Sequence, residues 1–405
     1  MMRAAATQFT VVKSLAVCLV AAGLLVPLRA YSVPSARPED VGFSSERLRH
    51  IGDTIQRHID ARNIAGAVTL VASGGRIAHF EAHGLMDLES KQPMTKDTVF
   101  RIMSMTKPVT AVAVMMLEEE GRLRVTDPVS KYIPEFTHVT VGDARVPVAR
   151  EITIAHLLTH TSGMPNGNIA ERSDETLAAA MPRLAQVPLS FQPGSEWAYS
   201  GLLGPDVLAR IVEIVSGQPY DRFLRERIFD PLGMKETSHY PADAQRPRVA
   251  TLYTRTATGL VPREDTYSSR TYFSGSAGLL STAEDYLQFA QMLANGGELN
   301  GRRLLKAETV RRIATNHVGD LFNGKLNFPN RGVGFGYLVA LIEDSRTAAW
   351  PLPDGTFGWF GAYGTQVWIN QKERLVTLLM VQKFQGLSLE YQRDFDAAVA
   401  QARLK

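Results

Sequence analysis

Apolar residues recur with a helical period in the first part of the sequence. From residue 45 to residue 59 they appear every three or four positions, which predicts a helix with one apolar face. The apolar positions of this segment are Leu48, Ile51, Ile55 and Ile59. Ser44 or Ser45 can cap the helix, because a serine oxygen accepts hydrogen bonds from the free N–H groups of a first turn.

Four other segments have the pattern of paired strands. Residues 67–72 (AVTLVA) and 76–84 (RIAHFEAHG) flank a Ser-Gly-Gly sequence, which predicts a hairpin. Residues 365–370 (TQVWIN) and 375–382 (LVTLLMVQ) flank a polar QKER turn in the same way. A closing helix is predicted after them. Its apolar stripe consists of Tyr391, Phe395, Ala398, Val399 and Ala402. The pattern indicates an α/β (α+β) fold with one antiparallel sheet, built from both chain ends and covered by helices.

The middle of the chain is predicted to be mostly helical. The candidate helices are residues 104–120, 154–160, 206–216, 219–229 and 282–294. Ser281 and Glu284 form a capping-box pattern before the last of them. A polar stretch between about 237 and 274 has no strong period. We therefore expect a sheet subdomain (about 38–105 and 275–405) with a helical subdomain (about 106–274) inserted in it.

The first 30 residues resemble a secretory signal. Arg3 and Lys13 precede an uncharged run from Ser14 to Leu28, which is short for a membrane span, and the segment ends near Ala30. We expect a signal peptide at residues 1–30, cleavage after Ala30, and a mature protein (31–405) that is periplasmic or secreted and has no stable membrane span. An uncleaved N-terminal anchor is the alternative interpretation. The single cysteine lies inside this run, so the mature chain would have no disulfide and no thiol nucleophile.

The charge balance argues against nucleic-acid binding. Three of the 44 basic residues lie in the first 30 positions, which contain no acidic residue, and the remaining 41 match the 41 acidic residues. Neutralisation of phosphates dominates affinity for nucleic acids, and the mature chain has no basic surplus for it.

The sharpest chemical signal is Ser104-Met105-Thr106-Lys107, at the start of a predicted apolar helix. Ser104 and Lys107 are three residues apart and would share one face of the first turn, so the amine can approach the hydroxyl. The helix N-terminus supplies free N–H groups that suit a developing oxyanion. Buried beside the serine, Lys107 would act as the base. Taken alone, the motif also fits a capping serine next to an exposed lysine.

The wider sequence resembles the serine β-lactamase and penicillin-binding-protein superfamily, in particular the branch of class C β-lactamases, DD-peptidases and family VIII carboxylesterases. The resemblance extends from about residue 38 to residue 400. The segments that carry it are residues 100–136, 152–165 (ITIAHLLTHTSGMP), 193–200 (PGSEWAYS), 229–237 (FDPLGMKET), 276–297 and 361–370 (GAYGTQVWIN).

The resemblance implies further site residues. Tyr199 matches the tyrosine of the family's Tyr-x-Asn motif, but Gly201 stands where the asparagine would be. Trp359-Phe360-Gly361 occupies the place of the Lys-Thr-Gly or Trp-Gly-Gly motif. The N–H of Ala362 would complete the oxyanion hole with that of Ser104. Trp359 and Phe360 would form an apolar wall for an acyl chain or an alcohol.

Other candidate motifs are weaker. His156 and His160 are spaced like a helical zinc pair, but no third ligand is evident, and His160 is more simply a cation that caps a helix end. Ser274 stands where a nucleophile elbow around Ser276 would need glycine. Ser162 lies in a predicted helix stop.

The resemblance and the motif together predict an exported serine hydrolase that acts through an acyl-enzyme on small neutral esters. No metal ion or organic cofactor is implied, and the expected partner is a small ester or amide substrate. The alternatives are a β-lactamase or D-amino-acid peptidase with the same site, and a penicillin sensor that is acylated without turnover. The sequence does not indicate an oligomeric state.

Overall fold

The computed structural model describes residues 33–167, 175–264, 270–326, 328, 331–384 and 390–404. The predicted signal peptide, residues 1–30, lies outside these ranges. In the described part of the chain, no helix combines the length and the apolar character that crossing a bilayer requires.

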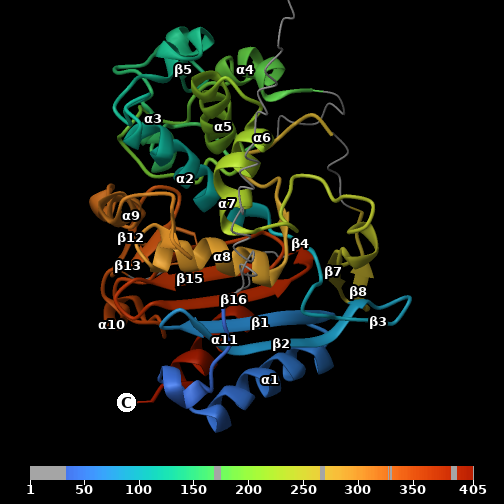
Figure 1. Ribbon diagram of the computed structural model, residues 1–405. Helices are drawn as coiled ribbons and strands as arrows, with labels where there is room; N and C mark the ends of the chain where they lie inside the picture. Colours follow the sequence, from blue (N-terminus) through green and yellow to red (C-terminus); the bar gives the residue numbers. More distant parts are fainter. Residues whose placement is uncertain are drawn as a thin grey trace, which may run out of the picture. The chain divides into compact units, whose positions relative to one another are not determined.

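The central element is one antiparallel sheet of eight strands (Figure 1). β1 pairs with β2 on one side and with β16 on the other, so the two ends of the chain meet inside the sheet. In spatial order the strands are β12 (Val333–Phe335), β13 (Ala340–Ile342), β14 (Phe357–Phe360), β15 (Gln366–Asn370), β16 (Leu375–Val381), β1 (Gly66–Ser73), β2 (Arg76–Asp87) and β3 (Gln92–Pro93). The predicted fold class and both predicted hairpins are confirmed.

Both faces of the sheet are buried. Val68 and Leu70 of β1 pack into the core shared with the central helices, whereas Ala67 and Val71 pack into a second core on the opposite face. Side chains of a strand alternate between faces, so a strand covered on both sides reads as a continuous apolar run such as AVTLVA.

Helices cover the two faces of the sheet (Figure 1). On one face lie α1 (Ser45–Asp60) and α11 (Glu390–Ala402), and on the other lies α8 (Ala283–Ala294). The helix predicted over 45–59 and the closing helix are thus confirmed. Thr282 caps α8 by accepting from the N–H of Asp285, one residue later than the capping box predicted from Ser281.

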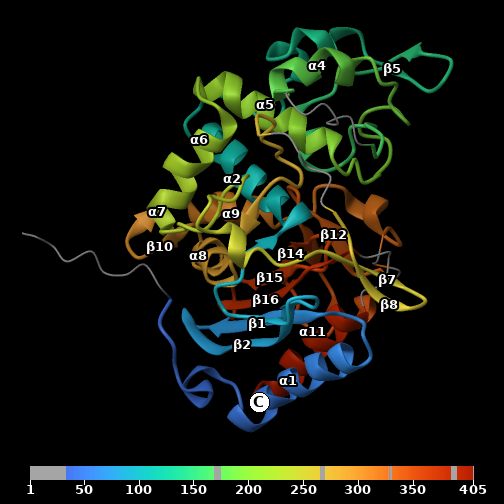
Figure 2. The same ribbon diagram turned by 90° about the vertical axis from the view of Figure 1, so that its right-hand side faces the viewer.

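A helical part stands beyond the α8 face of the sheet (Figures 1 and 2). Its helices are α2 (Thr106–Glu119), α3 (Ile154–Leu158), α4 (Leu177–Ala185), α5 (Leu203–Ser216), α6 (Tyr220–Leu224) and α7 (Asp230–Leu232). The helix predicted over 219–229 is interrupted, because residues Arg225–Phe229 form a π-helical turn between α6 and α7. α2 packs on α5 and is the buried axis of this part, with every side chain from Thr106 to Leu117 buried.

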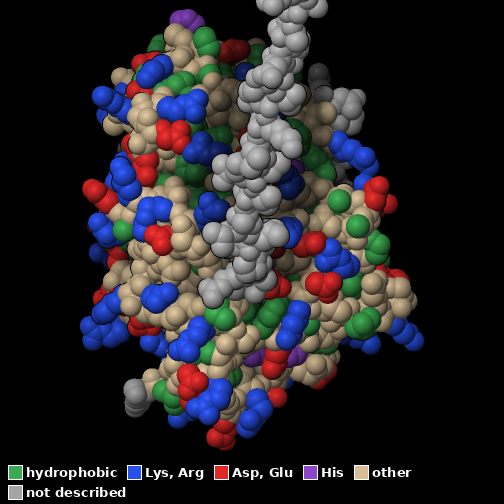
Figure 3. Space-filling model, in the orientation of Figure 1, with side chains coloured by type: hydrophobic (Ala, Val, Ile, Leu, Met, Phe, Trp, Pro, Cys, Tyr) green, Lys and Arg blue, Asp and Glu red, His purple; other side chains and the backbone are tan. Residues whose placement is uncertain are grey.

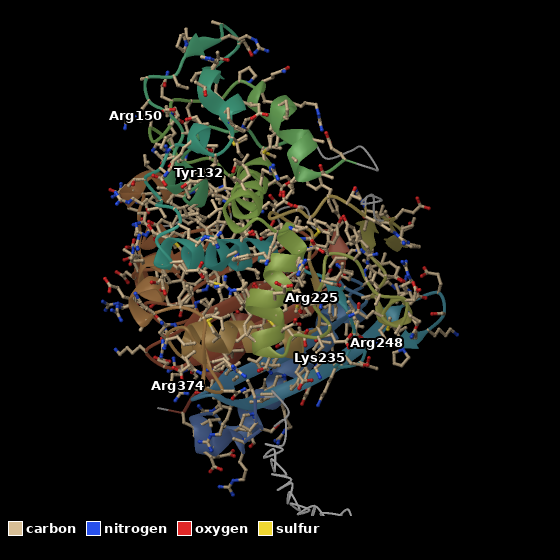
Figure 4. The ribbon with its side chains drawn as sticks, turned by 45° about the horizontal axis from the view of Figure 1, so that its top comes forward. Tyr132, Arg150, Arg225, Lys235, Arg248 and Arg374 are labelled. Atoms are coloured by element: carbon tan, nitrogen blue, oxygen red, sulfur yellow. The ribbon has the colours of Figure 1, made fainter. Side chains whose placement is uncertain are left out.

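Shorter elements complete the fold. They are α9 (Ala307–Ile313), α10 (Ser345–Ala348), β4 (Phe100–Arg101), β5 (Thr140–Val141), β6 (Val146–Pro147), β7 (Tyr253–Thr256), β8 (Gly259–Pro262), β9 (Leu280–Ser281), β10 (Glu298–Leu299), β11 (Arg302–Arg303) and β17 (Lys383–Phe384). β7 and β8 form a hairpin inside the polar stretch that has no strong sequence period. Arg248, labelled in Figure 4, ties this stretch down by donating to the carbonyl of Asp97 and pairing with Glu236.

Candidate active site

Ser104 lies in a short turn that several elements fix. β4 pairs with β9 just before the turn, and the N–H of Ile102 donates to the carbonyl of Leu279 over 3.0 Å. On the other side of Ser104, the hydroxyl of Tyr286 donates to the carbonyl of Met105 over 2.7 Å. The turn that carries the serine is therefore fixed by the β4–β9 pair on one side and by α8 on the other.

The backbone at this turn differs in detail from the prediction. Residues Met103–Met105 form a 3₁₀ turn, and the α-helix begins only at Thr106. Met103 has a φ of 48°, in the left-handed region that a side chain such as methionine rarely adopts. Such a conformation costs about 1 kcal/mol or more and persists only where its surroundings impose it. This backbone conformation places Ser104 directly before the first turn of α2.

The hydroxyl of Ser104 lies between an amine and a phenol. Lys107 Nζ is 3.0 Å from Ser104 Oγ, and Tyr199 Oη is 2.8 Å from the same oxygen. Lys107 is fully buried, its amine also donates to the carbonyl of Ser276 over 3.0 Å, and it lies 4.9 Å from the centre of the Tyr199 ring. The three residues singled out from the sequence are thus brought together, although they come from two segments 92 or more positions apart.

Aromatic side chains surround Tyr199. The rings of His160, Trp359 and Trp197 lie 4.8, 5.6 and 6.4 Å from it, centre to centre. Trp359 is fully buried, and its indole N–H donates to Tyr199 Oη over 3.3 Å. Trp359 therefore contacts the phenol rather than forming an open wall. Phe360, which stacks on Trp359, is the partly exposed aromatic residue of the pair.

His160 is an uncharged residue of this aromatic cluster, not a capping cation. It is fully buried, and burial together with nearby Lys107 lowers its pKa well below the usual value. Its Nδ1 pairs with Ser200 Oγ at 2.8 Å, next to Tyr199 in the chain. His156 has a different role: its ring accepts from the N–H of Thr153 in a capping box. No group of potential metal ligands occurs in the residues the structure covers.

Gly361 allows β14 to approach the serine turn. A Cβ at this position would overlap the carbonyl oxygen of Ile102 and the hydroxyl of Thr365. The N–H of Gly361 donates to the carbonyl of Thr365, whose hydroxyl donates to the carbonyl of Ile102. In the described part of the chain, the N–H of Ala362 donates to no backbone acceptor. Because Ala362 follows Gly361 directly, its N–H remains the predicted partner of the Ser104 N–H in an oxyanion hole.

The position of the missing Tyr-x-Asn asparagine is filled from another loop. Gly201 has a φ of 49°, and a Cβ there would overlap the side-chain amide of Asn166. An exposed amide thus stands two residues from Tyr199, supplied by the loop after α3. The sequence motif gave no sign of it, because the two loops are distant in sequence.

The arrangement defines a class of enzyme. A buried lysine and a tyrosine both contact one serine hydroxyl at a helix N-terminus, and no cofactor is needed for such a group to act as an activated nucleophile. This is a serine hydrolase of the β-lactamase and penicillin-binding-protein type.

Comparison with known proteins gives the family. The Beta-lactamase family model matches residues 51–401, and the chain belongs to that family. It is 33% identical over 392 residues to esterase EstB of Burkholderia gladioli, covering 88% of this chain and 95% of EstB. A putative D-alanyl-D-alanine carboxypeptidase of Salmonella typhimurium is 29% identical over 309 residues, or 68% of this chain and 71% of the relative. The structure of EstCE1, described as a hydrolase with promiscuous acyltransferase activity, has a TM-score of 0.79 at 30% identity and covers 88% of this chain and 99% of its own.

Proposed function

We propose that this protein is an exported carboxylesterase that hydrolyses small neutral esters through an acyl-enzyme on Ser104. The observation that carries the proposal is the position of Ser104 Oγ, within 3.0 Å of Lys107 Nζ and 2.8 Å of Tyr199 Oη. Each of these two groups can take the serine proton when it is in its basic form.

In the first half of the reaction, Ser104 Oγ attacks the ester carbonyl while its proton passes to the Lys107–Tyr199 pair. The N–H groups of Ser104 and Ala362 would stabilise the oxyanion. The pair then returns a proton to the departing alcohol. In the second half, a water molecule attacks the acyl-enzyme and its proton passes to the same pair. The bond to Ser104 Oγ then breaks, the pair returns the proton to that oxygen, and the acid is released.

Two observations favour esters over anionic substrates. The strand positions before Gly361 carry Trp359 and Phe360, which offer no formal charge to a substrate carboxylate. Relatives that cover nearly the whole chain include EstB, named as an esterase, and EstCE1, described as a hydrolase. The alternatives with the same site are a β-lactamase and a D-amino-acid peptidase, which the Salmonella relative's name suggests.

The deciding experiment compares substrates on purified protein that begins at Tyr31. We expect many product equivalents per protein from p-nitrophenyl acetate or butyrate, and a far lower kcat/KM for a chromogenic cephalosporin. A single equivalent of product from every substrate would instead identify a sensor. A cephalosporin rate at or above the ester rate would identify a β-lactamase.

Export is a separate part of the proposal. It rests on the basic residues and uncharged run of residues 1–30. Expression of the full chain in a Gram-negative host, followed by fractionation and N-terminal sequencing, tests it. We expect mature protein that starts at Tyr31 in the periplasm or medium. Full-length protein in the membrane fraction would support the anchor.

A further inference from the structure

A buried carboxylate lies behind the catalytic lysine, and the reaction scheme above does not use it. Asp206, in the first turn of α5, is 2% exposed. Its two oxygens accept three hydrogen bonds: from the hydroxyls of Tyr272 and Ser274, each at 2.8 Å, and from the N–H of Ser276 at 3.0 Å. Two hydroxyls and an amide that converge on one carboxyl stabilise its ionised form.

This carboxylate fixes the turn that holds Lys107. Ser276 donates its N–H to Asp206 and accepts the Lys107 amine on its carbonyl oxygen, at 3.0 Å. Ser274 Oγ also accepts from the N–H groups of Ser276 and Ala277. The orientation of the turn therefore depends on Asp206. The carbonyl of Ser276 in this turn accepts from the Lys107 amine and so holds it near Ser104.

The same carboxylate interacts electrostatically with Lys107. Burial raises the pKa of Asp206, while its three hydrogen bonds and the charge of Lys107 oppose that rise. A negative charge near an amine favours the protonated ammonium form. The negative charge of Asp206 therefore acts on the Lys107 amine, in addition to fixing the turn that holds it.

The other ionisable groups that face this pair are neutral or belong to the reacting pair. Next to Lys107, Tyr199 is its reaction partner and His160 is uncharged. Next to Asp206, burial raises the pKa of the phenols of Tyr272 and Tyr220 above the usual value, so both stay protonated at neutral pH. Among the described residues, Lys107 is the charged group that acts on Asp206.

We propose that Asp206 is a positioning residue that holds Lys107 against Ser104 and that, through its negative charge, sets the pH dependence of the reaction. The inference rests on the proposed function, since it assumes that Lys107 acts as a base. The fall of the rate at acidic pH would then depend on a residue that does not contact the serine.

The test is the pH dependence of kcat/KM for p-nitrophenyl butyrate in the wild type and in Asp206→Asn, which keeps the side-chain shape and removes the charge. We expect the acidic limb of the profile to move to lower pH by about one unit. A loss of packing alone would instead lower the rate evenly at all pH values. The rate of labelling by a fluorophosphonate, followed over the same pH range, gives the second readout without turnover.

The control is Asp396→Asn. Asp396 is also fully buried, but it lies on α11 on the far face of the sheet and pairs with Gln366 at 2.9 Å. This variant is expected to leave the acidic limb in place. An equal shift in Asp396→Asn, or a folded Asp206→Asn enzyme with an unmoved limb, overturns the proposal.

A second variant decides the matter if Asp206→Asn does not fold. Tyr272→Phe removes one hydroxyl that stabilises the ionised carboxylate, and it should move the limb in the same direction by less. An unmoved limb in that variant overturns the proposal. Failure of the proposed function itself has a different signature, because Ser104→Ala would then retain ester hydrolysis and labelling.

Discussion

The indole N–H of Trp359 donates a hydrogen bond to the phenol oxygen of Tyr199, at 3.3 Å. The same oxygen lies 2.8 Å from Ser104 Oγ, so the indole is one hydrogen bond away from the nucleophile. Trp359 is completely buried. Its contribution to the reaction is therefore made through Tyr199 and not by touching a substrate.

Trp359→Phe should lower kcat for ester hydrolysis by about 3- to 10-fold. The variant keeps an aromatic ring and removes one hydrogen bond, which contributes about 0.5–1.5 kcal/mol. Because the effect is on proton transfer, KM should change little. Steady-state kinetics with p-nitrophenyl butyrate measure both parameters.

Trp350→Phe is the matched control for this variant. Trp350 is a buried tryptophan of the same core cluster, and its indole nitrogen has no hydrogen-bond partner among the described residues. The Trp350→Phe variant should have a lower thermal stability, without a specific fall in kcat. Equal losses of kcat in the two variants would show that packing, and not the bond to Tyr199, explains the effect.

Ser104→Ala should abolish both ester hydrolysis and covalent labelling by a fluorophosphonate. Ser162→Ala and Ser276→Ala should keep both activities. The hydroxyl of Ser276 donates to the carbonyl of Leu202, and only its backbone carbonyl meets Lys107. Mass spectrometry of the labelled protein identifies the modified residue. Labelling that persists in Ser104→Ala would place the nucleophile elsewhere.

Tyr199→Phe should lower turnover by about 100-fold or more, the usual scale for a general acid–base group. The pH–rate profile should also change shape, because the variant removes one of the two groups that contact the serine hydroxyl. The ring and its aromatic contacts remain, so the protein should fold normally. An unchanged rate and profile would move the proton transfer to another residue.

The sequence predicted those parts of the fold and site that depend on local pattern. The period of residues 45–59 predicts α1, and the apolar run of residues 67–72 predicts β1, because burial of one face or two leaves a readable spacing. The three-residue spacing of Ser104 and Lys107 places them on one face of a turn. The match of Tyr199 to a family motif supplied the third member.

The remaining features depend on contacts between distant segments. β12 and β13 have only three residues each, too few to show an alternation, and their pairing fixes them. His160 is neutral because aromatic rings from other elements bury it, which its place after a helix could not reveal. Asp206 left no distinct signal, because an acidic residue at the start of the helix predicted over 206–216 is ordinary for a first turn.

Asp285 should make the protein less stable as the pH rises. Burial raises its pKa to about 6, against hydrogen bonds from Thr237 and the N–H of Glu236. The folded state thus holds the proton more tightly than the unfolded state, and this stabilisation is lost as pH rises through 6. Relative to wild type, Asp285→Asn should gain about 2 kcal/mol in unfolding free energy between pH 4.5 and pH 8.

Urea unfolding at the two pH values measures this difference. Asp127→Asn is a control in which the pKa shift has the opposite direction. Burial acts to raise the pKa of Asp127, but hydrogen bonds from Lys131 and Tyr132 outweigh it and lower the pKa to about 2. That variant should not gain stability at higher pH. A constant difference between Asp285→Asn and wild type would show that Asp285 does not titrate in this range.

Phe360→Lys should shift the substrate preference towards anionic substrates. β-Lactams carry a carboxylate close to the scissile carbonyl, and Phe360, partly exposed and directly before Gly361, offers it no charge. A charge-assisted hydrogen bond contributes about 1.5–3 kcal/mol, so the ratio of cephalosporin to ester kcat/KM should rise by about 10-fold or more. Phe360→Met, of similar length but uncharged, should leave the ratio near that of wild type. If the lysine and methionine variants give the same ratio, the missing cation does not explain why β-lactams are disfavoured. The shape of the acyl site would then be the cause.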